Sequence, residues 1–354
     1  MITLAPQSPT EEFLRQLDQW LASPALYTKI QMRAVVRLKE LVSRPLALVI
    51  LGEACAGKSS LLNALVGETV VSTGGLGRVR PLVRVMYGDT YAAYAIRVDG
   101  SRRRITSKAF EQVSTGQSLF SSDDAKVIYR ARGVQTAKPP TDSQTAIICA
   151  EVRFPIPLLK EVEFIEFPAS FHLTSTGRTR LRNYSRFDIA LWATPASQAW
   201  KRSELLSWRE LLPAQAQHSI IVATKKDGLA GVEDHERLMA RIERDTSTFF
   251  KARFLVSAKQ ALDASRRQED VESFINAGMS QLEAEIQELV ATIREARLTR
   301  AKGILERIEN KAAKLENKAA KPGGIIAEPA VSNSVIAELC GGPYPSGHAP
   351  LSLS

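Results

Sequence analysis

The sequence predicts an α/β fold with a mostly parallel central sheet, flanked by a short helical bundle that both termini form. Three observations favour this fold. Strand-like and helix-like segments alternate from residue 44 onward, which is typical of parallel sheets with crossover helices. The continuous apolar run Leu46–Leu51 is typical of a strand buried on both faces. Amphipathic helical patterns precede and follow this alternating region.

Composition and charge exclude several classes of protein. Apolar residues make up 44% of the 354 residues, which excludes a disordered or fibrous chain, yet no apolar run reaches the ~20 residues of a membrane span. Residues 1–12 lack the features of a signal peptide. The three cysteines and four histidines are scattered, so a reducing cytoplasm is expected, and a disulfide scaffold or zinc site is not. The formal charge of +9 favours an anionic partner, with a solvated basic surface as the alternative.

Two helices are expected within residues 1–43, the N-terminal part of the bundle. Ser8 is suited to cap the first helix, because Pro9 fits the first helical position. Leucines at helical spacing give this helix an apolar face: Leu14, Leu17 and Leu21. The second helix is predicted over Tyr27–Val42.

Residues 44–262 are predicted to form the domain that contains the sheet. After the first strand, strands are expected at Leu82–Tyr87, Tyr91–Val98, Ala146–Phe154, Val162–Phe167, Ile189–Trp192, Ser219–Ala223 and Phe254–Val256. Helices are expected at Ser59–Val66, Ser107–Ser114, Arg202–Leu212 and Glu233–Phe249. The segment 100–144 is polar and weakly periodic, so it is interpreted as an insertion rather than as core.

A long helix is expected from Val271 onward, within residues 263–320. Its apolar residues alternate steps of four and three: Ile275, Met279, Leu282, Ile286, Leu289, Ile293 and Ala296. This heptad pattern is typical of a helix that packs in a bundle, here against the N-terminal helices, with a self-associating coiled coil as the alternative. Residues 321–354 are rich in Gly, Pro and Ser and are predicted to form a flexible tail.

The strongest functional motif follows the first strand and fits G-x-x-x-x-G-K-[ST] at a strand-to-helix turn, the context of a phosphate-binding loop. Its residues are the candidate phosphate ligands: Gly52, Glu53, Ala54, Cys55, Ala56, Gly57, Lys58, Ser59 and Ser60. In such a loop, backbone N–H groups surround the β-phosphate, Lys58 contacts phosphate oxygens and the Ser59 hydroxyl is a magnesium ligand. We expect Lys58 to lie near solvent in the empty protein.

Two later segments predict which base is bound. Thr224, Lys225 and Asp227 fit the [NT]-K-x-D element of GTP-binding proteins, in which the aspartate accepts hydrogen bonds from guanine N1 and N2 and the lysine stem covers the base. Ser257, Ala258 and Lys259 end the following strand, where the Ala258 N–H is placed to reach guanine O6. GTP or GDP is therefore the expected ligand, and a small-molecule kinase is disfavoured.

A magnesium site is predicted between these motifs. Glu166-Phe167-Pro168-Ala169 occupies the place of the D-x-P-G element, in which the acidic residue holds Mg²⁺ through water. The predicted Mg²⁺ ligands are Ser59 and Glu166.

The phosphate loop and the following Leu61-Leu62-Asn63-Ala64-Leu65 resemble those of dynamin-like large GTPases, including bacterial dynamin-like proteins. Segments 73–88 and 155–160 are similar to the switch I region of that family and to the approach to its switch II. The resemblance covers about residues 8–310. It implies a P-loop GTPase domain, bundled terminal helices, and hydrolysis of GTP to GDP and phosphate. The helical region is short for a dynamin stalk, so membrane remodelling by a stalk is not expected.

Departures from the family pattern shape the functional prediction. Gly77, Arg78 and Val79 stand where the family places switch I threonines. Weak or impaired GTP hydrolysis is therefore expected, with Lys58, Ser59 and Arg78 as the candidate catalytic residues and Arg78 as an internal positive charge. The alternative is a pseudo-GTPase module that holds nucleotide structurally and presents a surface to a partner. A protein, a second copy at the GTPase face and a peripheral membrane contact are the partners left open, whereas nucleic acid is not expected.

Overall fold

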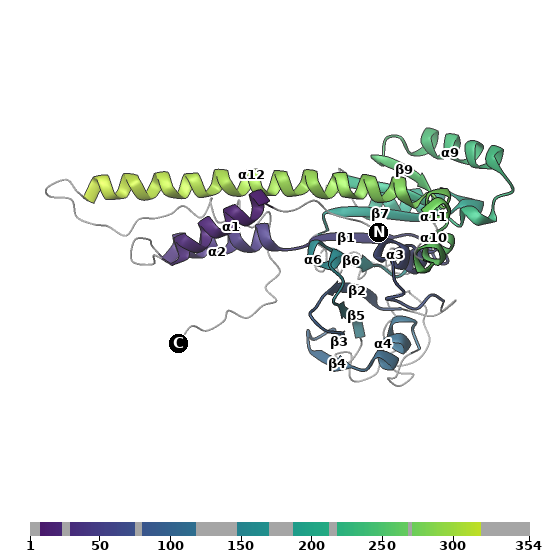
Figure 1. Cartoon of the computed structure of the whole chain (residues 1–354), viewed down its shortest axis with the longest axis horizontal. Helices are drawn as coiled ribbons and strands as arrows, with labels where there is room; N and C mark the ends of the chain where they lie inside the picture. The colour runs from purple at the N-terminus through teal and green to yellow at the C-terminus, as the bar shows by residue number, and fades with distance from the viewer. Residues whose placement is uncertain are drawn as a thin grey trace. The chain divides into compact units, whose positions relative to one another are not determined.

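The computed structural model describes residues 8–22, 29–74, 80–117, 147–169, 187–211, 218–267 and 271–319. These residues belong to two compact units, and most of their elements are labelled in Figure 1. Among the described residues, the first unit spans Pro45–Leu289, and the second combines those from Ser8 to Arg44 with those from Val290 onward. The predicted tail 321–354 lies outside the described residues. Within the described ranges, no helix is long and apolar enough to cross a membrane.

The described residues of the first unit form a nine-stranded sheet in the order β4-β3-β5-β2-β6-β1-β7-β8-β9. The strands are β1 (Leu46–Leu51), β2 (Leu82–Tyr87), β3 (Ala92–Arg97), β4 (Arg102–Ile105), β5 (Ile147–Phe154), β6 (Val162–Glu166), β7 (Ile189–Pro195), β8 (Ser219–Thr224) and β9 (Ala252–Leu255). Strands β6, β1, β7, β8 and β9 are parallel neighbours. β2 pairs antiparallel with β6 and parallel with β5, and β3 pairs antiparallel with β5 and β4. The predicted mostly parallel α/β fold is confirmed.

Helices connect the parallel strands, because a parallel pair cannot be joined by a tight turn. Helix α3 follows β1, α8 joins β7 to β8, and α9 joins β8 to β9. The helical segments of this unit are α3 (Lys58–Val66), α4 (Ser107–Ser114), α6 (Leu158–Glu161), η3 (Ala196–Gln198), α8 (Arg202–Leu211), η5 (Lys226–Gly228), α9 (Val232–Thr246), α10 (Ala258–Arg266), α11 (Val271–Asn276) and the first part of α12 (Met279–Ala319). The carboxyl ends of the five parallel strands therefore lie along one sheet edge, where such folds bind ligands.

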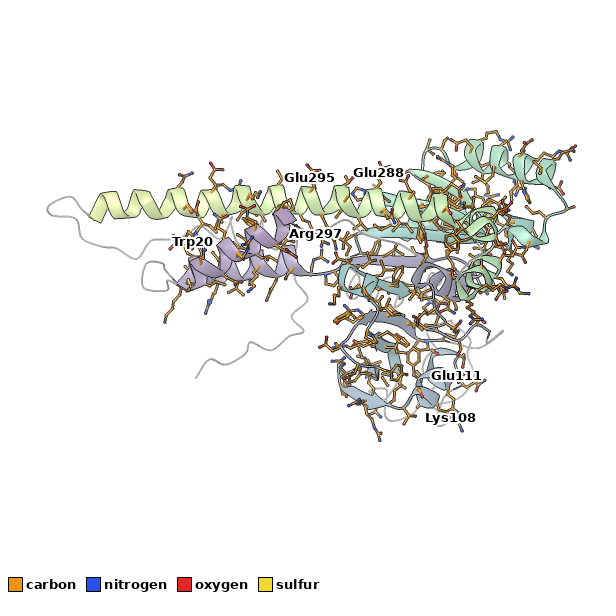
Figure 2. The ribbon with its side chains drawn as sticks, viewed as in Figure 1. Trp20, Lys108, Glu111, Glu288, Glu295 and Arg297 are labelled. Atoms are coloured by element: carbon orange, nitrogen blue, oxygen red, sulfur yellow. The ribbon has the colours of Figure 1, made fainter. Side chains whose placement is uncertain are left out.

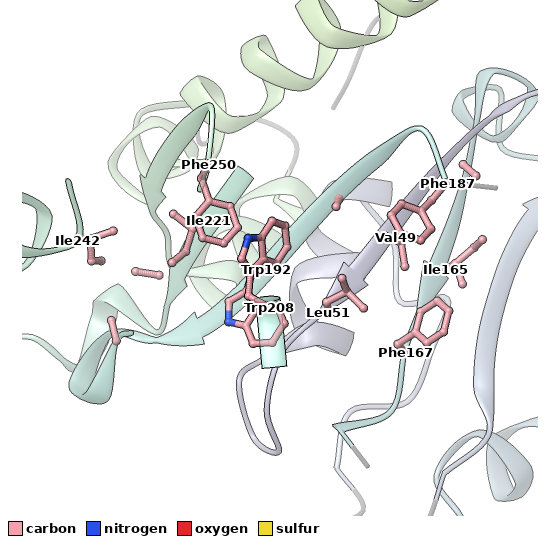
Figure 3. Close-up of a cluster of buried hydrophobic side chains, with 14 of the residues drawn as sticks. Val49, Leu51, Ile165, Phe167, Phe187, Trp192, Trp208, Ile221, Ile242 and Phe250 are labelled. Carbon is pink, nitrogen blue, oxygen red and sulfur yellow. The ribbon is translucent and has the colours of Figure 1, made fainter. Parts of the chain in front are cut away.

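Aromatic residues form much of one buried cluster, shown in Figure 3. Trp192 of β7 is fully buried and meets the Trp208 ring of α8 edge-on, with ring centroids 5.9 Å apart. Trp208 in turn lies 4.3 Å from the Phe250 ring, measured between centroids. Val49 and Leu51 of β1 belong to the same cluster. This packing holds β1 and β7 side by side, and so fixes where the loop that follows β1 begins.

The interpretation of residues 100–144 as an insertion is wrong at its N-terminal end. Residues 102–105 form β4, which pairs with β3, and the predicted helix α4 buries Phe110 and Val113. Strand β4 escaped prediction because its sequence, Arg-Arg-Arg-Ile, lacks an apolar face. Arg102 pairs instead with Glu151, which is 3% exposed. Residues 118–146 lie outside the described residues.

The second unit is a helical bundle of α1 (Ser8–Leu21), α2 (Lys29–Ser43) and the part of α12 from Val290 onward (Figure 1). Apolar residues of all three helices share one buried cluster: Phe13, Leu17, Trp20, Ala34, Val35, Leu38, Ala301, Ile304, Leu305 and Ile308. Trp20, labelled in Figure 2, also donates a hydrogen bond from Nε1 to Glu309 Oε1 at 3.0 Å. The structure thus contains the predicted bundle of segments from both termini.

The part of α12 that packs in this bundle is not the predicted one. Residues Met279, Leu282, Ile286 and Leu289 are buried within the first unit, and Ile275 is 47% exposed. The bundle instead uses the stretch Ala301–Ile308, which lies further along the helix. The physical reason is length: α12 has 41 residues, about 60 Å at 1.5 Å per residue, so one continuous helix serves the two units in succession.

Candidate nucleotide-binding site

The loop between β1 and α3 has the backbone shape of a phosphate-binding loop. Gly52 has φ +140°, and a Cβ added there would lie 2.2 Å from Ala193 O on the neighbouring strand. Gly57 has φ +78°, and its added Cβ would lie 3.1 Å from Thr224 Oγ1. Cys55, which is exposed, also has a positive φ of 61°. The two glycines are therefore required by conformation and by close approach, as the motif predicts.

Lys58 is buried rather than near solvent, so that expectation is wrong for this structure. Its side chain turns back onto the loop, and Nζ donates hydrogen bonds to Gly52 O at 3.0 Å and to Glu53 O at 2.8 Å. Burial lowers the pKa of Lys58 to about 8; Glu166 opposes this shift and Arg80 adds to it. The ammonium group thus donates its hydrogen bonds to carbonyls of the same loop in which a phosphate would bind.

Ser59, Glu166 and Arg80 meet beside the loop. Ser59 Oγ, in the first turn of α3, donates a hydrogen bond to Glu166 Oε1, at the end of β6, at 2.8 Å. Arg80 Nη1 lies 3.4 Å from Ser59 Oγ and 3.7 Å from Glu166 Oε1. Arg80 Nε donates to Ser114 O at 2.6 Å, which ties the arginine to the end of α4. The predicted pair of Ser59 and Glu166 is thus brought together, with an arginine against both side chains.

Ser59 and Glu166 carry the oxygen atoms that Mg²⁺ prefers. Glu166 Oε2 is buried and has no hydrogen-bond partner within the described residues. As arranged, however, the pair does not fit the ion. A magnesium ion would bind Ser59 Oγ at about 2.1 Å, whereas the positively charged Arg80 Nη1 already lies 3.4 Å from that oxygen and 3.7 Å from Glu166 Oε1. The described ranges also hold no cluster of three or more His, Cys, Asp or Glu residues that could bind a metal.

The second predicted motif lies at the ends of β8 and β9. Thr224 Oγ1 donates a hydrogen bond to Ala56 O at 2.8 Å, which joins this motif directly to the phosphate loop. Lys225 has φ +60°, and Asp227 Oδ1 accepts a hydrogen bond from Ser257 Oγ at 2.5 Å. Ala258 then begins α10, the helix that Ser257 caps through the N–H of Gln260. Lys225, Asp227 and Lys259 are exposed and open to a ligand.

A buried carboxylate that sequence reasoning missed supports the loop from β7 and α8. Glu204 is fully buried and accepts hydrogen bonds from Trp192 Nε1, Thr194 Oγ1 and the Lys201 N–H, at 3.1, 3.0 and 2.9 Å. Glu53 of the loop accepts a hydrogen bond from Ser203 Oγ at 2.6 Å. The only sequence signal for Glu204 is an acidic residue in the first helical turn, which usually indicates dipole compensation alone.

The predicted site residues therefore gather along one sheet edge wherever the structure describes them. Arg78 lies outside the described residues, as do the neighbouring Gly77 and Val79. Arg80, which is not among the predicted site residues, is the arginine that the structure brings to the site. The loop, the lysine at the start of α3 and the motif that follows β8 together define a P-loop nucleotide-binding domain.

Comparison with known proteins places this domain in a family. Residues 48–226, about half of the chain, match the model of the Dynamin family, and the chain belongs to that family. Dynamin-like protein 2 of Campylobacter jejuni subsp. jejuni serotype O:23/36 (strain 81-176) is 23% identical over 256 residues, which are 71% of this chain and 37% of that protein. The predicted resemblance to bacterial dynamin-like proteins is confirmed.

Solved structures show the same fold. An oligomerised bacterial dynamin pair, which provides a mechanism for the long-range sensing and tethering of membranes, superposes with a TM-score of 0.58 at 18% identity, over 89% of this chain and 57% of that chain. A second structure of such a pair gives a TM-score of 0.56 at 18% identity, over 87% and 56% of the two chains. This chain spans less than two thirds of the length of these relatives.

Proposed function

We propose that this chain binds the guanine nucleotides GTP and GDP and hydrolyses GTP slowly. One observation carries the proposal: the hydrogen bond from Thr224 to Ala56 O joins the phosphate loop to the guanine-type motif, which is the segment from Thr224 to Asp227 predicted to bind the base. Three residues beyond Thr224, Asp227 contacts Ser257 at the start of α10. Phosphate-binding and base-binding groups thus follow one sheet edge, as a single nucleotide requires.

Each group has a proposed role. Lys58 exchanges its loop carbonyls for phosphate oxygens, and the N–H groups at the start of α3 surround the β-phosphate. Asp227 accepts hydrogen bonds from guanine N1 and N2, Lys225 covers the base face, and the Ala258 N–H donates to O6. Ser59 and Glu166 are the residues that would hold Mg²⁺ if Arg80 moved away. A bound magnesium ion would neutralise charge on the phosphates.

Slow hydrolysis is the part of the proposal that rests on sequence. Transfer of the γ-phosphoryl group to water depends on a positioned water and on neutralised oxygens. Switch I offers Gly77-Arg78-Val79 in place of the family threonines, and Ala169 replaces the switch II glycine. Arg78 remains a proposed internal charge. The competing candidate is a pseudo-GTPase module that keeps its nucleotide, and the position of Arg80 favours it, because a guanidinium 3.4 Å from Ser59 Oγ and 3.7 Å from Glu166 Oε1 opposes a cation at the two proposed metal ligands.

Partners and organisation are proposed on the basis of the relatives. The related bacterial dynamin pair is oligomerised and is described as tethering membranes. We propose a second copy at the GTPase face and a peripheral membrane contact as the partners to test first, with the chain in the cytoplasm. Residues 44–262 would carry the nucleotide chemistry, while 1–43 and 263–320 supply the helical part. The test for a second copy also tests the predicted coiled coil, in which the α12 helices of two copies would associate.

The test is a titration with fluorescent GDP and ADP, followed by single-turnover hydrolysis of GTP. Wild-type protein is expected to bind GDP and not ADP, and Asp227→Ala to lose this preference, because one charged pair of hydrogen bonds is worth tenfold or more in affinity, roughly. Equal affinity for both bases would overturn the guanine assignment. Rapid multiple-turnover hydrolysis would contradict slow chemistry, and undetectable hydrolysis with tight binding would favour the pseudo-GTPase.

A further inference from the structure

Arg80 brings a permanent positive charge into the phosphate site. Its side chain is 16% exposed and lies just before β2. Nη1 is 3.4 Å from Ser59 Oγ and 3.7 Å from Glu166 Oε1, the two side chains that would otherwise face a magnesium ion. Because a guanidinium does not deprotonate in proteins, this charge is present at any physiological pH.

Several contacts hold the guanidinium in this position. Nε donates a short hydrogen bond to Ser114 O, at the C-terminal end of α4, where the helix dipole favours a cation. Nη1 also lies 3.5 Å from Gly74 O. Glu166 is only 4% exposed, and a buried carboxylate without a counter-charge is strongly destabilising. Removing Arg80 from the site would therefore leave Glu166 with only the Ser59 hydrogen bond and the charge of Lys58.

Two buried atoms at this cluster are unsatisfied within the described part of the chain. Arg80 Nη2 has no acceptor there, and Glu166 Oε2 has no donor. Leaving a buried guanidinium N–H unpaired is costly, and phosphate oxygens are among the acceptors that best suit it. Ser59, which Arg80 contacts, is the second residue of α3 and directly follows the phosphate-binding Lys58. A nucleotide phosphate in the loop would supply the missing acceptor.

We propose that Arg80 supplies the positive charge that magnesium supplies in other phosphate-binding loops, so that this chain binds guanine nucleotide without a divalent cation. The inference rests on the proposed nucleotide binding. It follows from charge: Arg80 Nη1 lies 3.4 Å from Ser59 Oγ and 3.7 Å from Glu166 Oε1, so a divalent cation between these two side chains would meet a fixed positive charge. Arg80, Lys58 and the α3 N-terminus then neutralise the phosphates together.

The experiment compares affinity for fluorescent GDP and for a non-hydrolysable GTP analogue in magnesium chloride and in EDTA. Four full-length proteins are compared: wild type, Arg80→Gln, Arg80→Lys and Arg103→Ala. The glutamine variant removes the charge but keeps hydrogen-bonding capacity, so it disturbs the fold less than a truncation to a smaller side chain would. Arg103 is an exposed arginine of β4 and controls for loss of one surface charge.

We expect the nucleotide affinity of wild type and of Arg103→Ala to change by less than about threefold when magnesium is removed. Arg80→Gln should bind in magnesium and weaken by about tenfold or more in EDTA, since one charged hydrogen bond is worth that much. Arg80→Lys should remain independent of magnesium, because it restores the charge. A purely structural role would weaken binding equally in both buffers.

Three outcomes would overturn the inference. Wild-type protein that binds only with magnesium shows that the ion, not Arg80, provides the charge. Equal responses of wild type and Arg80→Gln to EDTA show that the Arg80 charge does not replace the ion. Wild-type protein that binds nucleotide in neither buffer instead refutes the proposed function itself, and this inference fails with it.

Discussion

Glu204 shows how a single side chain shapes the nucleotide site without facing it. Burial raises its pKa, while the hydrogen bonds from Lys201 N–H, Trp192 and Thr194 oppose that shift. Thr194 also accepts, through its carbonyl oxygen, a hydrogen bond of 3.3 Å from Thr224 Oγ1. One buried carboxylate thus links the start of α8 to the end of β7 and, through Thr194, to the guanine-type motif.

Glu204→Gln is expected to lower the free energy of unfolding by about 1–3 kcal/mol, because the amide NH₂ must face a donor. The pKa of Glu204 is higher in the folded state than in the unfolded state. Its contribution to stability therefore decreases as pH rises from the unfolded-state pKa through the folded-state pKa. The stability difference between wild type and variant should therefore shrink from acidic to neutral pH. Urea unfolding at several pH values measures this. The exposed Glu233→Gln is the control, and an identical pH dependence in wild type and Glu204→Gln would contradict the assignment.

Lys58→Ala is expected to weaken GDP binding by about tenfold to a hundredfold, the value of one or two charge-assisted hydrogen bonds. The melting temperature should not fall, because the variant removes a buried ammonium whose charged form the fold disfavours. A GDP titration and a thermal melt measure the two effects. Lys39→Ala, at an exposed bundle position, should alter neither property. Unchanged GDP affinity in Lys58→Ala would mean that the loop is not the phosphate site.

Local motifs predicted the site where a few consecutive residues define the chemistry. The loop from Gly52 to Ser60 and the motif from Thr224 to Asp227 are of this kind, because the backbone of one turn presents every group. The role of Arg80 could not be predicted, since its partners Ser59, Ser114 and Glu166 come from three distant segments. Only the folded sheet brings them within hydrogen-bonding reach.

Secondary-structure elements were predictable where their own sequence carried an apolar pattern. Strand β2 has the predicted bounds, and so does α4, whose N-cap Thr106 accepts a hydrogen bond from the Ala109 N–H. Strand β4 was not predictable, because an ion pair of Arg102 with Glu151, rather than an apolar face, attaches it to the sheet. Its position in the sheet depends on Tyr94 and Glu151 of neighbouring strands, which Arg102 contacts.

Two glycines near or within α12 should respond in opposite directions to alanine. Gly278 has φ +78°, and an added Cβ would lie 2.3 Å from Leu255 O, so Gly278→Ala should destabilise the first unit by more than about 1 kcal/mol. Gly303 lies inside the helix with nothing within 4 Å of its added Cβ, so Gly303→Ala should stabilise by up to about 1 kcal/mol. Chemical denaturation of the full chain tests both. Equal effects of the two substitutions would contradict this description of the helix start.

The division of the chain into two units separates the candidate nucleotide site from the helical bundle. Every described residue of the candidate site belongs to Pro45–Leu289, while the bundle has its own buried cluster. Units with separate cores can open with different free energies. A change in the bundle core is therefore expected to leave GDP affinity intact.

Leu38→Ala tests this separation, because Leu38 is fully buried in the bundle cluster. The substitution should destabilise the bundle by about 2–5 kcal/mol through lost burial and a residual cavity. Val36→Ala on the same helix is the control, since Val36 is 43% exposed. Limited proteolysis should cut Leu38→Ala faster within residues 8–43, with GDP affinity unchanged. Equal protease resistance of both variants would count against the bundle.

The hydrogen bonds that Lys58 makes to its own loop limit how fast a nucleotide can bind. The Lys58 ammonium is already saturated by Gly52 O and Glu53 O, so a phosphate that arrives at the loop finds its main counter-charge engaged elsewhere. Those two hydrogen bonds must break before the new ones form, which adds a first-order step to association. The observed rate should then level off as nucleotide concentration increases, instead of rising without limit. In stopped-flow traces, the plateau would report how often the empty loop releases its own lysine.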